Sequence, residues 1–382
     1  MDPRHPPAVP LAEYRSRVEA LRARLAALGV ETLLVFTPEN VCYLTGYETI
    51  GYASFQALVV RPQALLLFVR EMERTVAETT TWLDDFATYA DTEDPAAALL
   101  ALLDRRGWRY GRVAVELATW FATPALVDRL RAGLDEPVDG SGLVEEGRRV
   151  KSPAEVSLIR QACRITEAGM AAALEAVRPG VTEQAVAKAA YGAMMDAGSD
   201  FLVGDPIVTS GWRSGVAHTT FGGRTLEPGD TVLLELGGCR RRYFGPLMRS
   251  ASLPPVRPEV RRMARALRQA LEAAIAAIRP GATCGDVDRA CRDVLADAGY
   301  ADLFRKRTGY SVGVAFAPDW GEGHILSLRP DDPTPLEPGM VFHIPPALRV
   351  LGEFGLGFSE TVLVTAEGAE VLTAFPRDLY VP

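Results

Sequence analysis

The tetrapeptide Leu-Glu-Pro-Gly occurs twice in this chain, at Leu226–Gly229 and at Leu336–Gly339, and each copy precedes an apolar run typical of a buried strand. Upstream, the Arg-Pro-Gly-x-Thr turn at Arg178–Thr182 recurs at Arg279–Thr283, and an Asp-Ala-Gly tripeptide follows both copies at the same spacing. The repeated unit is too long for a solenoid repeat. This order predicts one α+β domain built from two similar halves, each with helices before strands, whose antiparallel strands face a shared site.

Length, charge and cysteine content limit the class of protein. The 382 residues predict two domains, each large enough for a hydrophobic core. The formal net charge of −8 argues against nucleic-acid binding, which needs a clustered basic surface. No apolar run reaches the length of a membrane span, so no membrane association is expected. The five cysteines lack a zinc-ligand spacing, which indicates mostly buried, reduced thiols and a cytoplasmic location.

The order of predicted elements divides the chain into a small and a large domain. Residues 1–146 alternate apolar strands with helices, as in an α/β domain, and a turn is expected at Thr37–Asn40. Residues 150–382 form the duplicated domain, whose first helix is indicated by the cap at Ser152–Glu155. The basic stretch Arg148–Lys151 between them is expected to be a solvated linker.

The duplication also locates a candidate site. Placing one Leu-Glu-Pro-Gly copy on the other superimposes Glu235 on Pro345. Strand side chains alternate between faces, so Glu235 shares its face with Gly237. Glu235, His343 and Glu360 are ionisable residues within otherwise apolar strands, and burying a charge without a partner is costly. A surface or core position would explain any one of them alone, but the duplication predicts that all of these strands face one cavity.

The motif order resembles the prolidase, aminopeptidase P and creatinase superfamily. This resemblance covers nearly the whole chain and implies an N-terminal creatinase-type domain followed by a duplicated "pita-bread" domain. The segment Thr308–His324 and the run Met340–Ile344 look most like the metal-independent ectoine hydrolase and creatinase branch. The resemblance also implies a homodimer.

Metal-dependent members of that superfamily carry two aspartates, a histidine and two glutamates as ligands of a dinuclear site. By motif, these positions correspond here to Glu235, Pro246, Tyr310, Pro345 and Glu360. Proline has no donor side chain and a neutral tyrosine is a poor ligand, whereas hard cations need several oxygen donors. We therefore expect neither a metal nor another cofactor.

The favoured function is metal-independent hydrolysis of a C–N bond in a small zwitterionic amidine or guanidine compound. Glu235 and Glu360 are suited to pair with a planar cation through charge-assisted hydrogen bonds. His218 matches a substrate-contacting histidine of the family and is suited to act as general base and acid. Alternatively, Glu235 attacks the amidinium carbon as a nucleophile.

Seven further residues are expected to contact substrate: Arg249, Tyr310, His343, Trp320, His324, Glu322 and Arg70. Arg249 is retained from a family motif and either orients a carboxylate or makes a structural salt bridge. The loop that carries Trp320, Glu322 and His324 is either functional or simply part of the surface. Arg70 resembles a position that, in creatinase-like dimers, reaches the substrate of the neighbouring subunit.

Two other functions stay open at this point. One is an Xaa-Pro dipeptidase or aminopeptidase P-like peptidase with an altered metal site. The other is a catalytically inactive pita-bread module that binds a peptide. Retention of His218, Glu235, Arg249 and Glu360 favours an enzyme.

Overall fold

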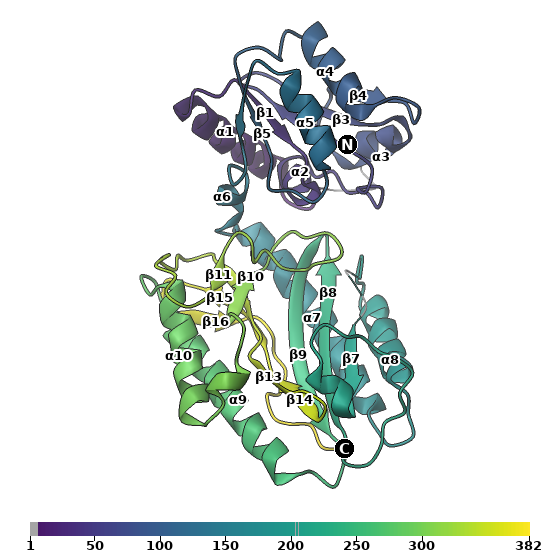
Figure 1. The fold of residues 1–382 in the computed structure, drawn as a ribbon, viewed down its shortest axis with the longest axis vertical. Coiled ribbons are helices and arrows are strands. Elements are labelled where there is room, and N and C mark those ends of the chain that lie inside the picture. Colours follow the sequence, from purple (N-terminus) through teal and green to yellow (C-terminus); the bar gives the residue numbers. More distant parts are fainter. Residues whose placement is uncertain (1–6, 203, 205) are drawn as a thin grey trace. The chain divides into compact units, whose positions relative to one another are not determined.

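The computed structural model describes residues 7–202, 204 and 206–382. The chain forms two compact units, residues 1–148 and residues 149–382, and each is described by itself (Figure 1). None of the described helices combines the length and the apolar content that a membrane crossing requires. All five cysteines are buried and unpaired with one another, as expected.

The first unit is a mixed six-stranded sheet with helices packed on it, in the order β4-β3-β2-β1-β5-β6. Its core is the apolar surface between this sheet and α4 and α5. The strands are β1 (Thr32–Val35), β2 (Ala57–Val60), β3 (Leu65–Arg70), β4 (Phe86–Tyr89), β5 (Arg112–Val115) and β6 (Glu136–Asp139). The helices are α1 (Leu11–Ala27), α2 (Pro38–Thr45), α3 (Arg74–Thr80), α4 (Pro95–Arg105), α5 (Pro124–Ala132) and α6 (Glu145–Arg148).

The turn expected at Thr37–Asn40 is wrong, because helix α2 begins there. Thr37 precedes the helix and Pro38 occupies its first turn, where a missing N–H costs nothing. The buried Glu116 carboxylate accepts a hydrogen bond from the Thr37 N–H at 2.7 Å. An acceptor that directly follows the distant strand β5 therefore holds the start of a helix that lacks a local side-chain cap.

The solvated linker expected at Arg148–Lys151 is also wrong. Arg148 is buried in the first unit and donates to Asn40 Oδ1 at 2.7 Å. Lys151 is buried in the second unit, where its Nζ lies 2.7 Å from Glu322 Oε2 and 2.8 Å from Ser311 Oγ. Buried charges need partners, and both basic residues have found one within their own unit.

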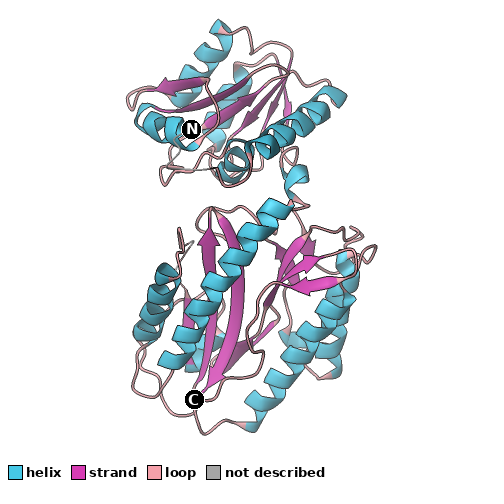
Figure 2. Ribbon diagram, turned by 180° about the vertical axis from the view of Figure 1, so that it is seen from behind, coloured by secondary structure: helices cyan, strands magenta, loops and turns pink. Residues whose placement is uncertain are grey.

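The second unit is an α+β domain with antiparallel sheets. Its helices are α7 (Pro153–Ala176), α8 (Glu183–Asp196), α9 (Pro258–Ala277) and α10 (Cys284–Asp297), with short 3₁₀ turns η2 (Gly211–Gly215) and η3 (Ala301–Leu303). One sheet has the order β7-β8-β9, with β7 (Ile207–Ser210), β8 (Thr231–Arg240) and β9 (Tyr243–Ser252). Figure 2, the view from behind, shows α7 crossing in front of the long strands β8 and β9.

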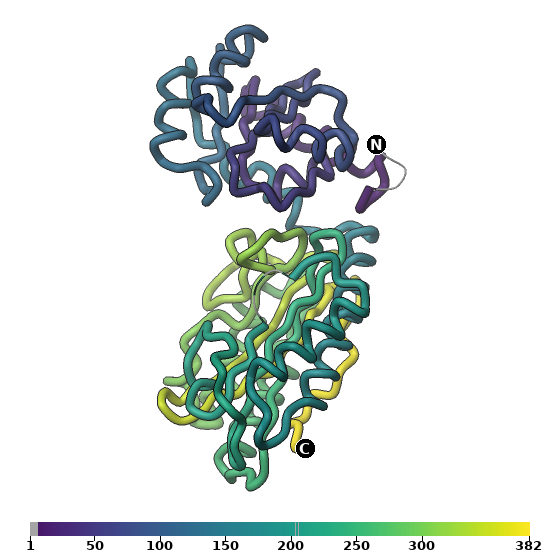
Figure 3. Tube along the Cα trace, turned by 90° about the vertical axis from the view of Figure 1, so that its right-hand side faces the viewer, coloured from purple at the N-terminus to yellow at the C-terminus, as the bar shows by residue number. Residues whose placement is uncertain are grey.

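The second sheet has the order β11-β10-β12-β15-β16. Its strands are β10 (Gly309–Ser311), β11 (Ser327–Leu328), β12 (Val341–Ile344), β15 (Glu360–Val364) and β16 (Ala369–Val371). Between β12 and β15 the chain forms the hairpin β13 (Ala347–Val350) and β14 (Phe354–Gly357). The C-terminal segment, yellow in Figure 3, returns along β9, where Ser252 N–H donates to the Tyr380 carbonyl at 2.9 Å.

The duplication predicted from the repeated motifs is present in the hydrogen bonds. In the first half, Gly180 N donates to Leu226 O at 2.9 Å and Leu226 N donates to Val181 O at 2.8 Å. In the second half, Gly281 N donates to Leu336 O at 3.2 Å and Leu336 N donates to Ala282 O at 2.8 Å. Each Leu-Glu-Pro-Gly glycine has a positive φ, 86° and 96° respectively, which glycine adopts without steric cost. The repeated turns therefore hold each helix pair to the start of its strand.

The two equivalent strands differ where they end. Strands β8 and β12 begin at Thr231 and Val341, each five residues after the leucine of the repeat. Strand β8 continues past Glu235, whereas β12 stops at Ile344 because Pro345 has no N–H to donate to a ladder. The chain then turns into the β13–β14 hairpin.

Candidate active site

Glu235 lies on the face of β8 that points away from helices α7 and α8. The alternate residues of this strand pack into the core below those helices, whereas Leu233 packs with Met248 and Ala347 on the opposite face. Glu235 follows Leu233 on that face and is paired across the ladder with Met248. Only 7% of Glu235 is exposed, yet no group among the described residues donates a hydrogen bond to its carboxylate or forms an ion pair with it.

Basic side chains act on this carboxylate from a distance. Burial raises the pKa of Glu235 above its ordinary value, and the positive charges of Lys306 and Arg349, with a smaller contribution from His218, oppose that shift. We call Glu235, Lys306 and Arg349 the open cluster, because their charges interact while no hydrogen bond or ion pair joins them within the described part of the chain. Such an arrangement leaves a buried acceptor and two donors available to a ligand.

Arg349 reaches the open cluster from the β13–β14 hairpin. Ala347 packs against Leu233, and Arg349 lies two residues further along β13, so its side chain leaves the strand on the same side. Its Nε is buried and has no hydrogen-bond partner within the described residues. Burial lowers the pKa of Arg349, although the guanidinium remains charged at neutral pH.

Lys306 lies in the segment between η3 and β10, and a second set of charges fixes its backbone. Arg292 Nη2 donates to the Lys306 carbonyl at 2.8 Å, and the Asp288 carboxylate binds Arg292 at 2.7 and 3.0 Å. Asp288 also accepts from the Thr308 hydroxyl at 2.8 Å. Burial lowers the pKa of Lys306 to about 8, so this ammonium titrates close to physiological pH.

A chain of hydrogen bonds lies beside the open cluster. Trp320 Nε1 donates to Tyr310 Oη at 2.9 Å, and Tyr310 Oη lies 2.9 Å from His343 Nδ1. His343 Nε2 lies 2.7 Å from Ser359 Oγ. Tyr310 and His343 are direct neighbours on β10 and β12, and their rings meet edge-on with centroids 5.3 Å apart. Burial lowers the pKa of His343 well below its ordinary value, so the ring is neutral at pH 7.

A close packing contact places this chain next to Glu235. The Trp320 ring lies against Gly237, where an added Cβ would come within 2.8 Å of it. Gly237 shares the strand face of Glu235. The glycine therefore allows Trp320 to approach the sheet, and through Trp320 it positions Tyr310. Burial raises the pKa of Tyr310, and the negative charge of Glu235 raises it further.

His218 follows η2 and is exposed. It has a φ of 52°, a left-handed conformation that is uncommon for residues other than glycine. Strained backbone of this kind is concentrated at functional sites. His218 contributes to the electrostatic environment of Glu235. The structure thus brings together His218, Glu235, Tyr310, His343 and Trp320 from the residues expected in the site.

Glu360 has a different environment from Glu235. It is fully buried, and its Oε1 accepts from Arg249 Nη2 at 2.8 Å and from Arg377 Nε at 2.7 Å. Its other oxygen accepts from the Thr373 hydroxyl. Arg249 also donates to main-chain oxygens, including that of Pro376 at 2.6 Å. We call Glu360, Arg249 and Arg377 the closed cluster, since every charge in it has a direct protein partner.

The remaining expected residues lie apart from the open cluster. Glu322 is buried and ion-paired with Lys151, so the surface-loop interpretation does not hold for it. His324 is exposed in the same loop. Arg70 belongs to the first unit, where it lies 3.4 Å from both Glu73 and Asp91.

The five family metal-ligand positions do not offer a donor set for a dinuclear centre. Pro246 and Pro345 have no donor atom. The Tyr310 oxygen is held by Trp320 and His343, and Glu360 is neutralised by two arginines. Of the five positions, only Glu235 has a donor side chain that no other described residue engages. No group of three or more histidine, cysteine or acidic side chains suitable for a metal occurs within the described residues.

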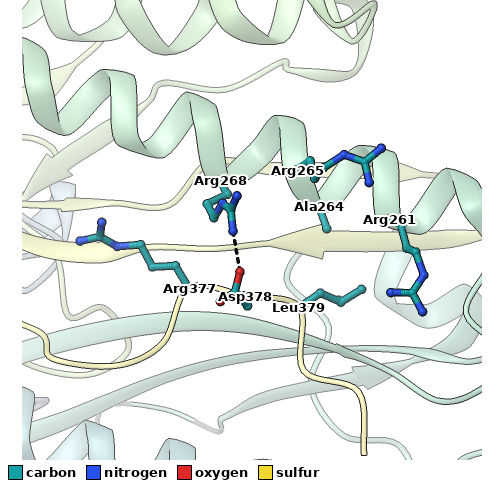
Figure 4. A pocket seen from close by; sticks show the side chains of 7 residues that line it. All are labelled: Arg261, Ala264, Arg265, Arg268, Arg377, Asp378 and Leu379. Carbon is teal, nitrogen blue, oxygen red and sulfur yellow. Dashed lines mark hydrogen bonds and ion pairs between the residues drawn. The ribbon is translucent and has the colours of Figure 1, made fainter.

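A separate pocket lies between α9 and the C-terminal segment, and it contains no member of the open cluster. Figure 4 shows its lining, in which Arg268 and Asp378 face one another at 2.5 Å. The lining residues are Arg261, Ala264, Arg265, Arg268, Arg377, Asp378 and Leu379. Arg377 belongs to the closed cluster, so this pocket adjoins the charges that stabilise the fold.

Comparison with known proteins identifies the family of each of the two units. Residues 157–366 match metallopeptidase family M24, and residues 17–150 match the creatinase/prolidase N-terminal domain. The chain belongs to family M24. It is therefore a member of the prolidase, aminopeptidase P and creatinase superfamily, with a creatinase-type N-terminal domain and a pita-bread domain, and it is a hydrolase of C–N bonds.

Individual relatives span the whole chain. An uncharacterized hydrolase/peptidase of Sinorhizobium fredii is 33% identical over 97% of both chains. The ectoine hydrolase of Halomonas elongata is 29% identical, again over 97% of both chains. Among solved structures, dipeptidase PepE from Mycobacterium ulcerans superimposes with a TM-score of 0.82 and 27% identity, over 97% of this chain and 98% of the other.

Sequence reasoning missed three residues of the site. Lys306 lies within the basic triplet Arg305–Arg307, a pattern typical of a solvated turn. Arg349 follows the proline pair that ends β12, and only a hairpin folded back on β8 places it near Glu235. Ser359 directly precedes Glu360, and its proximity to His343 depends on the pairing of β12 with β15.

Proposed function

We propose that this family member is a metal-independent hydrolase that cleaves a C–N bond in a small zwitterion carrying an amidinium or guanidinium group and a carboxylate. The observation that carries the proposal is the open cluster: a buried carboxylate and two cations interact without a direct partner. Buried charges without partners are costly, so a ligand that supplies both missing charges gains binding energy from the site.

Each charge of the substrate has a counterpart in the cluster. The planar cation pairs with Glu235, whose two oxygens accept no hydrogen bond from the described part of the chain. The substrate carboxylate pairs with Arg349 and Lys306, because a guanidinium and an ammonium both donate to carboxylate oxygens. In this proposal Glu360 has no contact with substrate and stabilises the fold through Arg249 and Arg377.

The reaction needs only a base and an acid besides these contacts. The oxygen of a water molecule bonds to the amidinium carbon, the π electrons of the C–N bond move to nitrogen, and His218 takes the proton that water loses. The C–N σ bond then breaks with its electron pair on nitrogen, which receives the proton from His218. The oxygen lone pair forms the carbonyl of the product, and the hydroxyl proton passes to solvent. Glu235 remains ionised and holds the cation in place.

Metal independence is part of the proposal and is supported by the donor set. Two prolines, a hydrogen-bonded tyrosine and a neutralised glutamate occupy four of the five ligand positions. The likeness to the ectoine hydrolase of Halomonas elongata supports a cyclic amidine as substrate, since ectoine combines that group with a carboxylate.

A second candidate is hydrolysis of a dipeptide. A free dipeptide is also a zwitterion, and its ammonium and carboxylate match the same three charges. The 27% identity to a dipeptidase of known structure supports this candidate to a similar degree. The two candidates differ in the bond that is cut, and they also differ in the expected dependence on metal.

The deciding experiment measures product formation and metal content on the same preparation. Chelator-treated protein is assayed by mass spectrometry with ectoine, creatine and Xaa-Pro dipeptides, and its Mn, Co, Fe and Zn are measured. We expect turnover of an amidine or guanidine compound with no stoichiometric metal. Turnover of dipeptides alone, lost on chelation and restored by metal, would refute the proposal in favour of the peptidase.

A homodimer in which Arg70 reaches the substrate of the partner subunit belongs to the same proposal. Its support is the position of Arg70 at the end of β3, where Glu73 and Asp91 hold it only at 3.4 Å. Light scattering is expected to give a dimer mass. Mixing Arg70→Ala and Glu235→Gln chains is expected to restore part of the activity that each variant lacks alone, and a monomeric active enzyme would contradict this.

A further inference from the structure

The hydrogen-bond chain beside Glu235 has a donor at each end. Trp320 Nε1–H donates into Tyr310 Oη at 2.9 Å, and the Met248 N–H donates into Ser359 Oγ at 2.6 Å. Between these ends lie two hydroxyl groups and the His343 ring, which are joined by two hydrogen bonds. A neutral histidine and two hydroxyls carry three protons in total. Two of these protons form the two hydrogen bonds, so the third must point away from this row of hydrogen-bonded groups.

Burial decides which proton that is. Ser359 is 0% exposed, and within the described residues no acceptor other than His343 is in reach of its hydroxyl. If the Ser359 proton were the spare one, it would be buried without an acceptor, which costs about 1–3 kcal/mol. Tyr310 is only partly buried and lies at the edge of the open cluster. The Tyr310 proton is therefore the one that points outward.

This choice also defines the tautomer of His343. The Ser359 hydroxyl donates to His343 Nε2, and His343 Nδ1–H donates to Tyr310 Oη. A protonated ring would fill both links by itself, but burial and the nearby charges of Lys306 and Arg249 keep the ring neutral. Tyr310 then accepts two hydrogen bonds, from Trp320 and from His343. Accepting two hydrogen bonds polarises its O–H group and makes it a better donor.

We propose that the Tyr310 hydroxyl is a catalytic hydrogen-bond donor to the oxygen on the reacting carbon of a substrate held by Glu235, and that Trp320, His343 and Ser359 are its positioning residues. This inference rests on the proposed function for the identity of that carbon. Trp320 sets the location, because its ring lies against Gly237 on the strand face that carries Glu235. The same donor would serve the carbonyl oxygen of a peptide.

Tyr310 acts without transferring its proton. Burial and the negative charge of Glu235 both raise the pKa of Tyr310, so the phenol stays neutral across the working range of the enzyme. In the second step of the proposed reaction the hydroxyl oxygen on the reacting carbon gains negative charge as its proton passes to solvent, and a preorganised donor aimed at that oxygen stabilises this transition state more than the ground state. Its removal is therefore expected to lower kcat rather than to raise KM.

The tautomer of His343 is a test that needs no substrate. The chain has four histidines, so selective ¹⁵N-histidine labelling gives a simple spectrum, and His343→Gln identifies the signal. Long-range ¹H–¹⁵N correlation is expected to show a protonated Nδ1 and an unprotonated Nε2 at pH 7. A protonated Nε2 or an imidazolium would overturn the inference. In Ser359→Ala the proton is expected to stay on Nδ1, because a protonated Nε2 would then be a buried donor without an acceptor.

The kinetic test uses Tyr310→Phe. We expect kcat to fall roughly 10²–10³-fold with KM changed less than about threefold, as for loss of one oxyanion donor. Tyr300→Phe is the matched control, since it removes a hydroxyl outside this chain of hydrogen bonds. An unchanged kcat in folded Tyr310→Phe would overturn the role. If wild-type protein turned over none of the test compounds, the proposed function would fail, while the tautomer result would still decide the proton arrangement.

Discussion

The closed and open clusters contain the same kinds of charged residue but differ in whether those residues contact one another directly. Each combines one carboxylate at a retained family position with two cationic side chains, within one domain. In the closed cluster, Glu360 accepts hydrogen bonds from both of its arginines at 2.7 and 2.8 Å. In the open cluster, Glu235 interacts electrostatically with its cations while none of them donates to it within the described residues.

The difference separates a charge set that stabilises the fold from one that is available to a ligand. Charges that already have direct partners gain little from a ligand, and breaking them leaves a buried charge unpaired. The charges of the open cluster lost hydration on burial, and no hydrogen bond or ion pair among them within the described residues compensates for that loss. In the proposed function, these charges bind the zwitterionic substrate. Three substitutions and a pH profile test this distinction, beginning with the largest expected effect.

The Glu235→Gln variant should separate activity from stability. Removing the buried charge that holds the substrate cation is expected to lower kcat/KM by about 10³-fold or more, because one partner of a desolvated ion pair is lost. The melting temperature should stay the same or rise, since the free protein loses a buried charge that no hydrogen bond or ion pair within the described residues satisfies. Steady-state kinetics and calorimetry measure the two effects. A loss of stability with intact turnover would reverse the assignment of the clusters.

The Glu360→Gln variant should behave in the opposite way. We expect the free energy of unfolding to fall by about 3 kcal/mol, because Arg249 is then buried beside a neutral amide. Urea titration measures this. Glu370→Gln is the matched control, since Glu370 pairs with Arg160 at the surface, where 42% and 43% of the two side chains are exposed. Its expected cost is below about 1 kcal/mol. Equal costs in the two variants would contradict a closed, buried cluster.

Removing the guanidinium of the open cluster should affect binding alone. Arg349→Met is expected to raise KM by about 10²-fold with kcat nearly unchanged, as the substrate carboxylate loses a charged partner. The stability of the free protein should not decrease, because the Nε of Arg349 has no hydrogen-bond partner among the residues that the structure describes. A lower kcat at constant KM would indicate that Arg349 acts in the chemical step and not in binding.

The smallest expected effect is a pH dependence. Burial lowers the pKa of Lys306 to about 8, so the ammonium is present below that pH and is lost above it. We expect kcat/KM to fall above pH 8, by up to tenfold per pH unit. Lys306→Arg should move this limb to higher pH, because arginine keeps its charge. Lys188→Arg serves as a control for the substitution. An alkaline limb that is the same in both variants would exclude Lys306 as its source.

Much of the fold follows from local sequence signals. The repeated turns predict the two halves and the start of both strands, because Arg-Pro-Gly-x-Thr and Leu-Glu-Pro-Gly encode their turns within a few residues. The position of Glu235 on β8 follows in the same way. Helix α2 was missed because its start is held by Glu116, which is 79 residues distant along the chain from Thr37.

The partners of the buried charges could not be predicted in this way. Whether Glu360 faces substrate or arginine depends on the path of the C-terminal segment that carries Arg377. Whether Arg349 meets Glu235 depends on a hairpin that folds onto β8. The pair Lys151–Glu322 likewise joins residues 171 positions apart. Local patterns show that a charge lies in an apolar strand, but its partner is set by tertiary structure.

The most direct test of the account is ligand binding to the open cluster. Chelator-treated wild-type protein, Glu235→Gln and Arg349→Met are melted with ectoine, creatine and Xaa-Pro dipeptides. A ligand at 100 times its Kd adds about 2.7 kcal/mol of stability to the native state. The account predicts that at least one small zwitterion raises the melting temperature of the wild type and raises it less in each variant. It would be contradicted if no zwitterion shifted the wild type, or if the shift were equal in all three proteins.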